Sequence, residues 1–216
     1  MLKHMFEERK PMKLFYAPNT ISIAVAIGLE EAGIAYEPVL VDFTKSEQTS
    51  ETYRAINPKL RVPALEFNGT ILTETGALLE LIATLAPNAT LVPADAVIAT
   101  HMRETMYYLA STMHVNHAHK GRGYRWADRE DSWADMAAKV PETMAASAAY
   151  VEENCVKGPF VTGDTISLAD PYLFMLCHWL GGDGVDISNY PRLSIFVATM
   201  SDRASIKSVR EKGLLT

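Results

Sequence analysis

The chain has 216 residues, of which 48% are hydrophobic, and a formal net charge of -6 at pH 7. That hydrophobic content is enough to bury the core of one large domain or two small ones. The acidic balance, without a dense block of Lys and Arg, argues against a nucleic-acid surface, because phosphate binding depends on clustered cations. No apolar run reaches the ~20 residues of a membrane helix, and residues 1–11 carry acidic side chains where a secretory signal would be apolar. We therefore expect a cytoplasmic protein with a short extension at residues 1–11.

The chain contains two cysteines, Cys155 and Cys177. They form no CxxC pair, and no histidine ligand pattern accompanies them, which argues against both a disulfide scaffold and a zinc site. We expect two buried, reduced thiols.

The first half of the chain alternates strand and helix patterns. Strand candidates at residues 13–16 and 36–41 enclose a periodic apolar segment, 21–32, which ends at Gly33, a residue typical of helix C-termini. The further elements expected here are a helix at 46–56, strands in "RVPALEF" and "TILTE" joined at Asn68-Gly69, and a helix at 76–85. This order predicts a small α/β domain of the thioredoxin type over residues 12–86, although spacing does not give the order of the strands.

Residues 97–216 have a different character, because long Ala-, Met- and Leu-rich helical periodicity replaces the strand patterns. Helix breaks are expected at 121–123, at Pro141, at Gly158-Pro159 and at 181–184. The second half is therefore predicted to be an all-helical bundle. Residues 87–96 contain two prolines and show no strong periodicity, so they are predicted to be the linker.

The segment "NPKLRVPALEF" places Pro63 immediately before a predicted strand. Proline cannot donate a ladder hydrogen bond, so an edge strand or a turn is one interpretation. The other is a cis Val62-Pro63 bond that leaves the backbone N–H and C=O of Val62 free to pair with an extended peptide ligand. Spacing alone favours the edge strand or turn.

The segment "LTETGALL" places Glu74 and Thr75 at the start of a predicted helix. Capping by Thr75 is the simple interpretation. A helix N-terminus also binds carboxylates, and a neighbouring glutamate can pair with an ammonium group. Glu74 and Thr75 together are therefore candidates for holding an amino-acid zwitterion.

A polar stripe of Tyr107, Ser111 and His114 runs along an otherwise apolar helix in "YYLASTMHVNHAHKGRG". The cationic and histidine residues that follow suit a helix C-terminus, because the helix dipole is negative there. His114 and His117 lack an evident third ligand for a metal, so no metal site is expected.

The segment "GDTISLADPYLF" has the pattern of a capping box, with Ser167 as N-cap and Asp170 three residues later. This pattern indicates a structural role and no chemistry.

Together these segments resemble the glutathione transferases, and most closely the bacterial beta class. The resemblance rests on "KLFYAP", "SIA", "LEEAG", "INPKLRVPALE", "LTET", "LASTMH" and "VTGDTISLADPYLFMLCHW", in that order along nearly the whole chain. It implies an N-terminal thioredoxin-like domain and a C-terminal helical domain, usually in a homodimer. It also implies glutathione as the co-substrate, bound in the cleft between the two domains.

The resemblance further implies roles for single residues. Val62, before a cis Pro63, would pair its backbone with the cysteinyl part of glutathione. Glu74 and Thr75 would hold the amino and carboxylate groups of the γ-glutamyl end, with Thr75 in place of the more usual Ser or Gly. Lys45 is near the position of a family lysine that reaches the glycyl carboxylate.

In the helical half, His114 falls on the family's active-site histidine, and Ser111 falls on a hydroxyl position of the same helix. Tyr107 replaces an amide and Val115 replaces a lysine. The contacts made by this helix must therefore differ in part from those of the class.

The main departure from the beta class lies in "FYAPNTISIAVA", where Ile21 replaces the class cysteine. A mixed disulfide with glutathione at that position is therefore not expected. A helix N-terminus and neighbouring hydroxyl groups can still stabilise a thiolate. We rank Ser22 first as the group that faces the sulfur, then Asn19 or Thr20, and then Tyr16.

The implied function is a glutathione transferase that activates the glutathione thiolate for attack on small hydrophobic electrophiles. Trp179, Tyr124 and Trp126 are candidate walls of the electrophile site, although such aromatic residues pack protein cores just as often. The alternatives are a glutathione-dependent disulfide reductase or peroxidase, and a non-enzymatic ligand-binding protein of the same fold.

Overall fold

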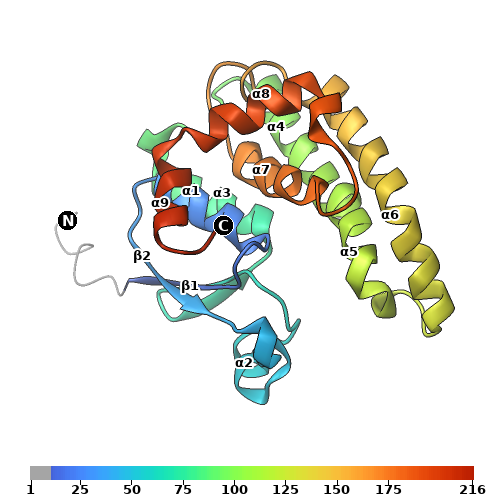
Figure 1. Ribbon diagram of the computed structural model, residues 1–216. Coiled ribbons are helices and arrows are strands. Elements are labelled where there is room, and N and C mark those ends of the chain that lie inside the picture. Colours follow the sequence, from blue (N-terminus) through green and yellow to red (C-terminus); the bar gives the residue numbers. More distant parts are fainter. Residues whose placement is uncertain (1–10) are drawn as a thin grey trace. The chain divides into compact units, whose positions relative to one another are not determined.

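The computed structural model describes residues 11–216, which form two compact units (Figure 1). One unit contains residues 11–89 together with Ser208–Thr216, and the other is Thr90–Lys207. The predicted extension at residues 1–11 lies, except for residue 11, outside the described residues. The structure groups Ser208–Thr216 with the first unit, although the periodicity of the sequence assigns them to the helical half.

The first unit is built on a four-stranded sheet with the strand order β2-β1-β3-β4. The strands are β1 (Met12–Tyr16), β2 (Tyr36–Leu40), β3 (Ala64–Phe67) and β4 (Thr70–Thr73). β1 runs parallel to β2 and antiparallel to β3, and β3 pairs antiparallel with β4. The predicted hairpin turn is confirmed, because Asn68 and Gly69 both have positive φ, as the tightest hairpin loops require.

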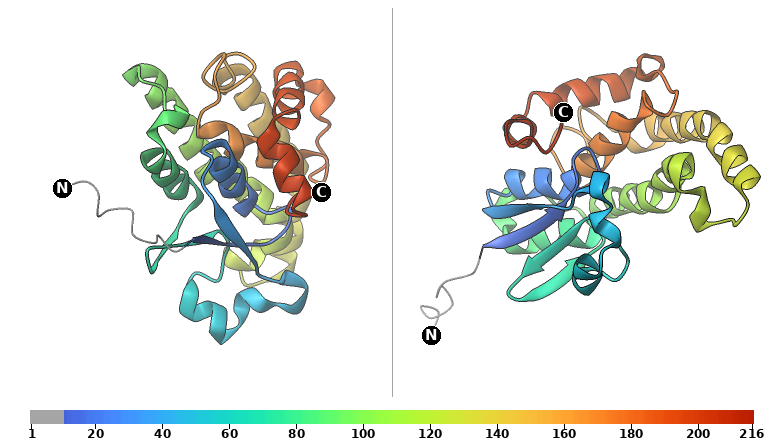
Figure 2. Two further views of the ribbon diagram at one scale, coloured as in Figure 1. Left: turned by 90° about the vertical axis from the view of Figure 1, so that its left-hand side faces the viewer. Right: turned by 60° about the horizontal axis from the view of Figure 1, so that its bottom comes forward.

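Helices cover the sheet from both sides (Figures 1 and 2). α1 (Ser22–Glu31) and α3 (Thr75–Leu85) pack together on one face, and α2 (Glu51–Ile56) lies on the other. The helix expected at 46–56 is shorter than predicted, because Ser46 adopts φ 57° and Ser50 caps α2 by accepting a hydrogen bond from the Tyr53 N–H. Two short 3-10 turns, Phe43–Lys45 and Glu47–Thr49, precede α2.

The second unit is helical, as the sequence predicts (Figure 2). Its helices are α4 (Ala96–Tyr108), α5 (His114–Arg122), α6 (Glu130–Tyr150), α7 (Ala169–Leu180), α8 (Pro191–Ser201) and the first residues of α9 (Ala204–Glu211). α5 and α6 run side by side, and α7 is buried along nearly its whole length. Within residues 11–216, no helix has both the length and the apolar character needed to cross a membrane.

Two π-helical segments interrupt the regular helices of this unit. Leu109–Met113 joins α4 to α5, and Val151–Cys155 follows α6. A π turn inserts an additional residue, so it rotates the following side chains about the helix axis. Ser111 and His114 therefore do not keep the simple helical spacing from Tyr107 that the sequence suggests.

The helix break expected at Pro141 is wrong, because α6 continues through this residue. Proline removes its own N–H, and with it one intrahelical hydrogen bond. Val140, Met144, Ser147 and Ala148 give α6 a buried face on both sides of that position. Packing of this face outweighs the loss of one hydrogen bond.

The capping box at the start of α7 forms in part, because the Asp170 N–H donates to the Ser167 carbonyl instead of the Ser167 hydroxyl. The helix also begins later than predicted. Leu168, and not Ser167, is the N-cap. The Asp170 carboxylate accepts hydrogen bonds from the Ser167 N–H at 2.6 Å, the Ser167 hydroxyl at 2.8 Å and the Val161 N–H at 2.8 Å. Complete burial raises the pKa of Asp170 to about 6, although these hydrogen bonds lower it.

Both cysteines are buried and unpaired, as expected. Burial raises the pKa of both the Cys155 and the Cys177 thiol, which keeps them protonated at neutral pH.

Candidate active site

The loop between β1 and α1 contains a compact network of hydroxyl groups. The Ser22 side chain has no exposed surface, and its Oγ lies 2.6 Å from Thr20 Oγ1 and 3.3 Å from the backbone N of Ala17. The Thr20 hydroxyl donates to the Ala17 carbonyl at 2.8 Å. Thr20 is partly exposed. The two hydroxyls therefore differ in access: Ser22 lies beneath the loop, and Thr20 lies at its surface.

The other two residues that the sequence proposes for the sulfur are placed differently. Asn19 adopts φ 57°, and both ends of its side-chain amide contact Thr216. Tyr16 is the last residue of β1, where its carbonyl accepts a hydrogen bond from the Val41 N–H at 2.8 Å. The side chain of Tyr16 is partly buried.

The Val62-Pro63 peptide bond is cis, which confirms that interpretation of the sequence. The Val62 side chain packs in the same hydrophobic cluster as Ala17, so the β1–α1 loop and the Val62 segment lie close together. Among the described residues, no hydrogen bond outside the strand ladders reaches the backbone N–H or C=O of Val62. The backbone of Val62 is therefore a candidate for pairing with a ligand.

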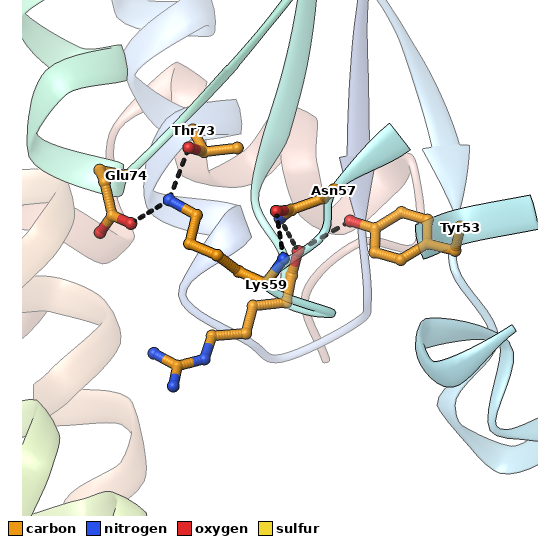
Figure 3. A network of polar contacts seen from close by, with 6 residues as sticks. Tyr53, Asn57, Lys59, Thr73 and Glu74 are labelled. Atoms are coloured by element: carbon orange, nitrogen blue, oxygen red, sulfur yellow. Dashed lines mark hydrogen bonds and ion pairs between the residues drawn. The ribbon is translucent and has the colours of Figure 1, made fainter. Parts of the chain in front are cut away.

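The residue before Val62 is fixed by hydrogen bonds from α2 and from the residue that follows this helix (Figure 3). The Tyr53 hydroxyl donates to the Arg61 carbonyl at 2.8 Å, and the Asn57 amide donates to the same oxygen at 2.6 Å. Burial raises the pKa of Tyr53 to about 12, so this hydroxyl remains a donor at neutral pH. Sequence reasoning missed both anchoring residues.

Glu74 and Thr75 lie at the start of α3. Glu74, and not Thr75, is the N-cap residue, with φ 74° and a side chain that is 72% exposed, whereas Thr75 is the buried first residue of the helix. The Lys59 ammonium group forms an ion pair with Glu74 and donates to Thr73 Oγ1 at 2.7 Å (Figure 3). A carboxylate, an ammonium group and a helix N-terminus therefore meet at one point, and a carboxylate beside a helix N-terminus is complementary in charge to an amino-acid zwitterion.

Lys59 is a further residue that sequence reasoning missed. It belongs to the segment "NPKLRVPALEF", in which Leu60, Arg61 and Val62 separate it from the cis proline. Its partner Glu74 is 15 positions away, beyond the β3–β4 hairpin. Spacing along the chain gives no signal for a contact of this kind.

Lys45 lies in the turn after β2 and is highly exposed. Its ammonium group lies 3.0 Å from Asp42 Oδ2. The Asp42 hydrogen bond raises the pKa of Lys45, and hydrogen bonds from Thr44 and Lys45 hold the pKa of Asp42 at about 2. Lys45 is therefore a fully charged cation at the surface of the first unit.

The remaining predicted site residues belong to the second unit. Ser111 donates a hydrogen bond to the Tyr107 carbonyl at 2.8 Å. The His114 ring lies 5.2 Å from the Trp179 ring, and His117 stacks on the same indole at 4.1 Å. His117 Nδ1 is 2.6 Å from the buried Asp183 carboxylate. Trp179 therefore contacts both histidine rings, whose centroids are 6.4 Å apart.

The aromatic residues proposed as walls of the electrophile site differ in exposure. Tyr124 and Trp126 are 57% and 46% exposed, on the turn between α5 and α6. The Trp126 ring contacts the His119 ring edge-on at 4.5 Å. Among the residues that the structure describes, no group of three or more His, Cys, Asp or Glu side chains is placed to hold a metal ion.

Known proteins resemble the chain over both units. Residues 10–84 match the glutathione S-transferase N-terminal domain, and residues 118–213 match the glutathione S-transferase C-terminal domain. A glutathione transferase homolog from Sulfitobacter, whose crystal structure contains bound glutathione, is 57% identical with a TM-score of 0.94. The match covers 95% of this chain and 99% of that chain.

More distant relatives extend the comparison. Glutathione S-transferase GstA of Escherichia coli O157:H7 is 28% identical, over 91% of this chain and 96% of its own length. A bacterial beta-class enzyme from Sphingomonas chungbukensis is 27% identical, with a TM-score of 0.78, over 94% of this chain and 99% of that chain. A probable maleylacetoacetate isomerase from Caenorhabditis elegans is 26% identical over 90% of each chain. The chain belongs to the glutathione S-transferase family.

Proposed function

We propose that this protein is a glutathione transferase, which binds glutathione in its first unit and activates the thiol for attack on small hydrophobic electrophiles. The observation that supports this proposal most directly is the start of α3, where the exposed Glu74 carboxylate lies beside the helix N-terminus that begins at Thr75. A γ-glutamyl group carries both an ammonium and a carboxylate on one carbon atom. This arrangement is complementary to both charges.

Glutathione is extended along the first unit in this proposal. Its γ-glutamyl end lies at Glu74 and Thr75, its cysteinyl part pairs with the Val62 backbone, and its glycyl carboxylate is reached by Lys45. Lys59 must share the Glu74 carboxylate with the incoming ammonium group. The Sulfitobacter homolog, 57% identical and containing glutathione, supports the choice of ligand.

The protein must also lower the pKa of the bound thiol. A free thiol has a pKa near 8.5, and lowering it by about two units stabilises the thiolate by roughly 2.7 kcal/mol. The positive end of the α1 dipole contributes to this stabilisation, and a hydroxyl that donates to the sulfur contributes more. Because Ser22 is fully buried and Thr20 is partly exposed, we propose Thr20 as the donor and Ser22 as its support.

The Thr20–Ser22 pair allows this exchange of hydrogen bonds without leaving a buried oxygen unsatisfied. Thr20 now donates to the Ala17 carbonyl, and Ser22 Oγ lies 3.3 Å from the same carbonyl. When Thr20 turns its proton to the sulfur, Ser22 can donate to that carbonyl instead. His114 and Ser111 are included in the proposed active site because of the family resemblance. A homodimeric assembly is proposed on the same basis.

The test compares Thr20→Val, which removes the hydroxyl at nearly constant shape, with Thr20→Ser, which keeps it. Losing one hydrogen bond to a charged sulfur costs about 1.5–3 kcal/mol, so Thr20→Val lowers kcat for aryl halide conjugation about 10- to 100-fold. Thr20→Ser retains most of the activity. If Ser22→Ala is as damaging as Thr20→Val and Thr20→Val raises no thiol pKa, Ser22 is the donor instead. Failure of the wild-type protein to bind glutathione at millimolar concentration contradicts the whole proposal.

A second candidate reaction is suggested by the relatives named maleylacetoacetate isomerases. A glutathione thiolate that adds to a double bond, allows rotation and then leaves would isomerise a cis-alkene conjugated to a carbonyl group. Turnover of such an alkene without net consumption of glutathione favours this reaction. Rapid reduction of a glutathionyl disulfide or a peroxide favours the reductase or peroxidase, and binding without turnover favours a ligand-binding protein.

A further inference from the structure

Residues Leu214–Thr216 contact the loop that the proposed function assigns to the thiolate. The Asn19 N–H donates to the Leu214 carbonyl at 3.2 Å. The Asn19 Nδ2 donates to Thr216 Oγ1 at 2.9 Å, and its Oδ1 accepts from the Thr216 N–H at 3.0 Å. The Asn19 side chain thus forms two hydrogen bonds with Thr216, which is 197 positions away in the sequence.

The residues just before Leu214 contact the opposite end of α1. The Ser208 hydroxyl donates to Glu30 Oε2 at 2.9 Å, and Lys212 forms an ion pair with Glu30. Burial alone would raise the pKa of Glu30, but the hydrogen bonds from Lys212 and Ser208 hold it below its usual value. Residues 208–216 therefore contact α1 at its last turn and again at the loop before its first turn (Figure 1).

Burial fixes the position of this segment independently of Asn19. Gly213 adopts φ 70° and turns the chain at the end of α9, where the Leu214 N–H donates to the Val209 carbonyl at 2.9 Å. Leu214 and Leu215 are 0% and 2% exposed. The carbonyl of Leu214 and the groups of Thr216 are therefore presented to the loop from a packed support.

The conformation at Asn19 determines where the next residue lies. Asn19 is in the left-handed region at φ 57°, which asparagine tolerates better than most residues. The Thr20 N–H then closes a turn onto the Ala17 carbonyl at 3.3 Å. A change in φ at Asn19 would move the Thr20 hydroxyl relative to the start of α1.

We propose that residues 214–216 hold the β1–α1 loop in the shape that activates glutathione, and that Asn19 is a positioning residue and not the group that faces the sulfur. This inference rests on the proposed function. The amide of Asn19 acts through Thr20, which it places next to the thiolate. Misplacing such a group by about 1 Å can reduce turnover as strongly as 100-fold, without any loss of direct contact with the substrate.

The experiment uses the full chain with Asn19→Gly, which keeps the positive φ and removes the amide, and Thr216→Val, which removes the hydroxyl at similar shape. Each variant lowers kcat for aryl halide conjugation about 10-fold and raises the pKa of the bound glutathione thiol, followed by the ultraviolet absorbance of the thiolate. KM for glutathione changes less than kcat. The double variant is no worse than Asn19→Gly alone, because Asn19→Gly already removes both hydrogen bonds to Thr216 and Thr216→Val removes one of the same two. Thr216→Ser keeps wild-type values.

A hydrogen-exchange control separates the possible outcomes. Hydrogen exchange of the amides at residues 20–23 becomes faster in Asn19→Gly, which shows that the loop has been released. If the loop is released while the thiol pKa and kcat stay unchanged, the segment is only a structural support and the inference is wrong. If the wild-type protein activates glutathione and neither variant changes any readout, the inference is wrong but the proposed function stands. If the wild-type protein does not activate glutathione, the proposed function fails first.

Discussion

Glu74 combines an uncommon backbone conformation with an exposed charge. Its φ of 74° is a region that non-glycine residues rarely adopt, at a cost of order 1–3 kcal/mol. Its carboxylate is 72% exposed and pairs with Lys59. This conformation places the carboxylate beside the N-terminus of α3. The free-energy cost of the positive φ therefore falls at a residue whose side chain is positioned to bind a ligand.

We expect Glu74→Gln to raise KM for glutathione about 10- to 100-fold, because a hydrogen bond or ion pair with a charged group is worth about 1.5–3 kcal/mol. The kcat should change little, since the γ-glutamyl end is bound equally in the ground state and the transition state. Steady-state kinetics at varied glutathione concentration measure both constants. Thr70→Ala, on the exposed start of β4, is the control, and an unchanged KM in Glu74→Gln contradicts the assignment.

At the scale of single residues, the sequence predicts some features and not others. The cis Val62-Pro63 bond was one of two interpretations of its spacing, and the family resemblance selected it. The burial of Ser22 could not be predicted, because it depends on how the loop from Ala17 folds over the hydroxyl. The Lys59–Glu74 contact was also hidden, because it joins two loops across a hairpin.

At the scale of elements, periodicity predicts the type of each helix better than its limits. Pro141 was expected to break a helix, yet α6 spans Glu130–Tyr150 without interruption. The cost of a proline is local, whereas the buried face of α6 extends over several turns. The π segment Leu109–Met113 was equally invisible, because an added residue leaves no pattern in composition.

Asp170 connects the start of α7 to the preceding loop, and its burial predicts a pH dependence. Its pKa of about 6 lies above the ordinary value of 3.8, so between these values the folded protein binds more protons than the unfolded chain. The contribution of Asp170 to stability is therefore complete at low pH and is lost as pH rises through about 4 to 6. The Asp170→Asn side chain cannot titrate. Its amide has one acceptor oxygen, so it accepts fewer of the three hydrogen bonds that the Asp170 carboxylate accepts.

The stability advantage of the wild-type protein over Asp170→Asn should therefore decrease as pH rises through this window and stay constant above it. Urea unfolding at a series of pH values measures this difference, and the comparison cancels the titration of groups that the two proteins share. Asp164→Asn, in the loop between Gly163 and Thr165, provides an exposed carboxylate control. An advantage that grows with pH would show that Asp170 has a lowered pKa.

At the scale of the whole molecule, the first unit is discontinuous in sequence. Residues 11–89 group with Ser208–Thr216, which follow the entire helical unit. Periodicity places residues 204–211 in the helical half of the chain, but it does not say which unit they pack against. The family resemblance predicts two domains, and the return of the last residues to the first one had to come from the structure.

Leu214→Ala should therefore destabilise the first unit, although the residue follows the second unit in sequence. Leu214 is fully buried, and such truncations cost about 2–5 kcal/mol. Hydrogen exchange should become faster in β1 and α1 and stay slow in α7. Ile195→Ala, at a position that is 59% exposed in α8, is the matched control, expected within about 0.5 kcal/mol of wild type. Loss of protection confined to α7 would contradict the grouping.

The return of residues 208–216 to the first unit also determines the order in which the protein can mature during synthesis. A ribosome adds about 5–20 residues each second, and domains generally fold as they emerge. The helical unit, Thr90–Lys207, is continuous and can fold as soon as it is outside the ribosome. Residues 11–89 of the first unit are synthesised earlier, but Ser208–Thr216 become available only after the helical unit has been synthesised. The unit that we propose binds glutathione is therefore begun before the helical unit and completed after it.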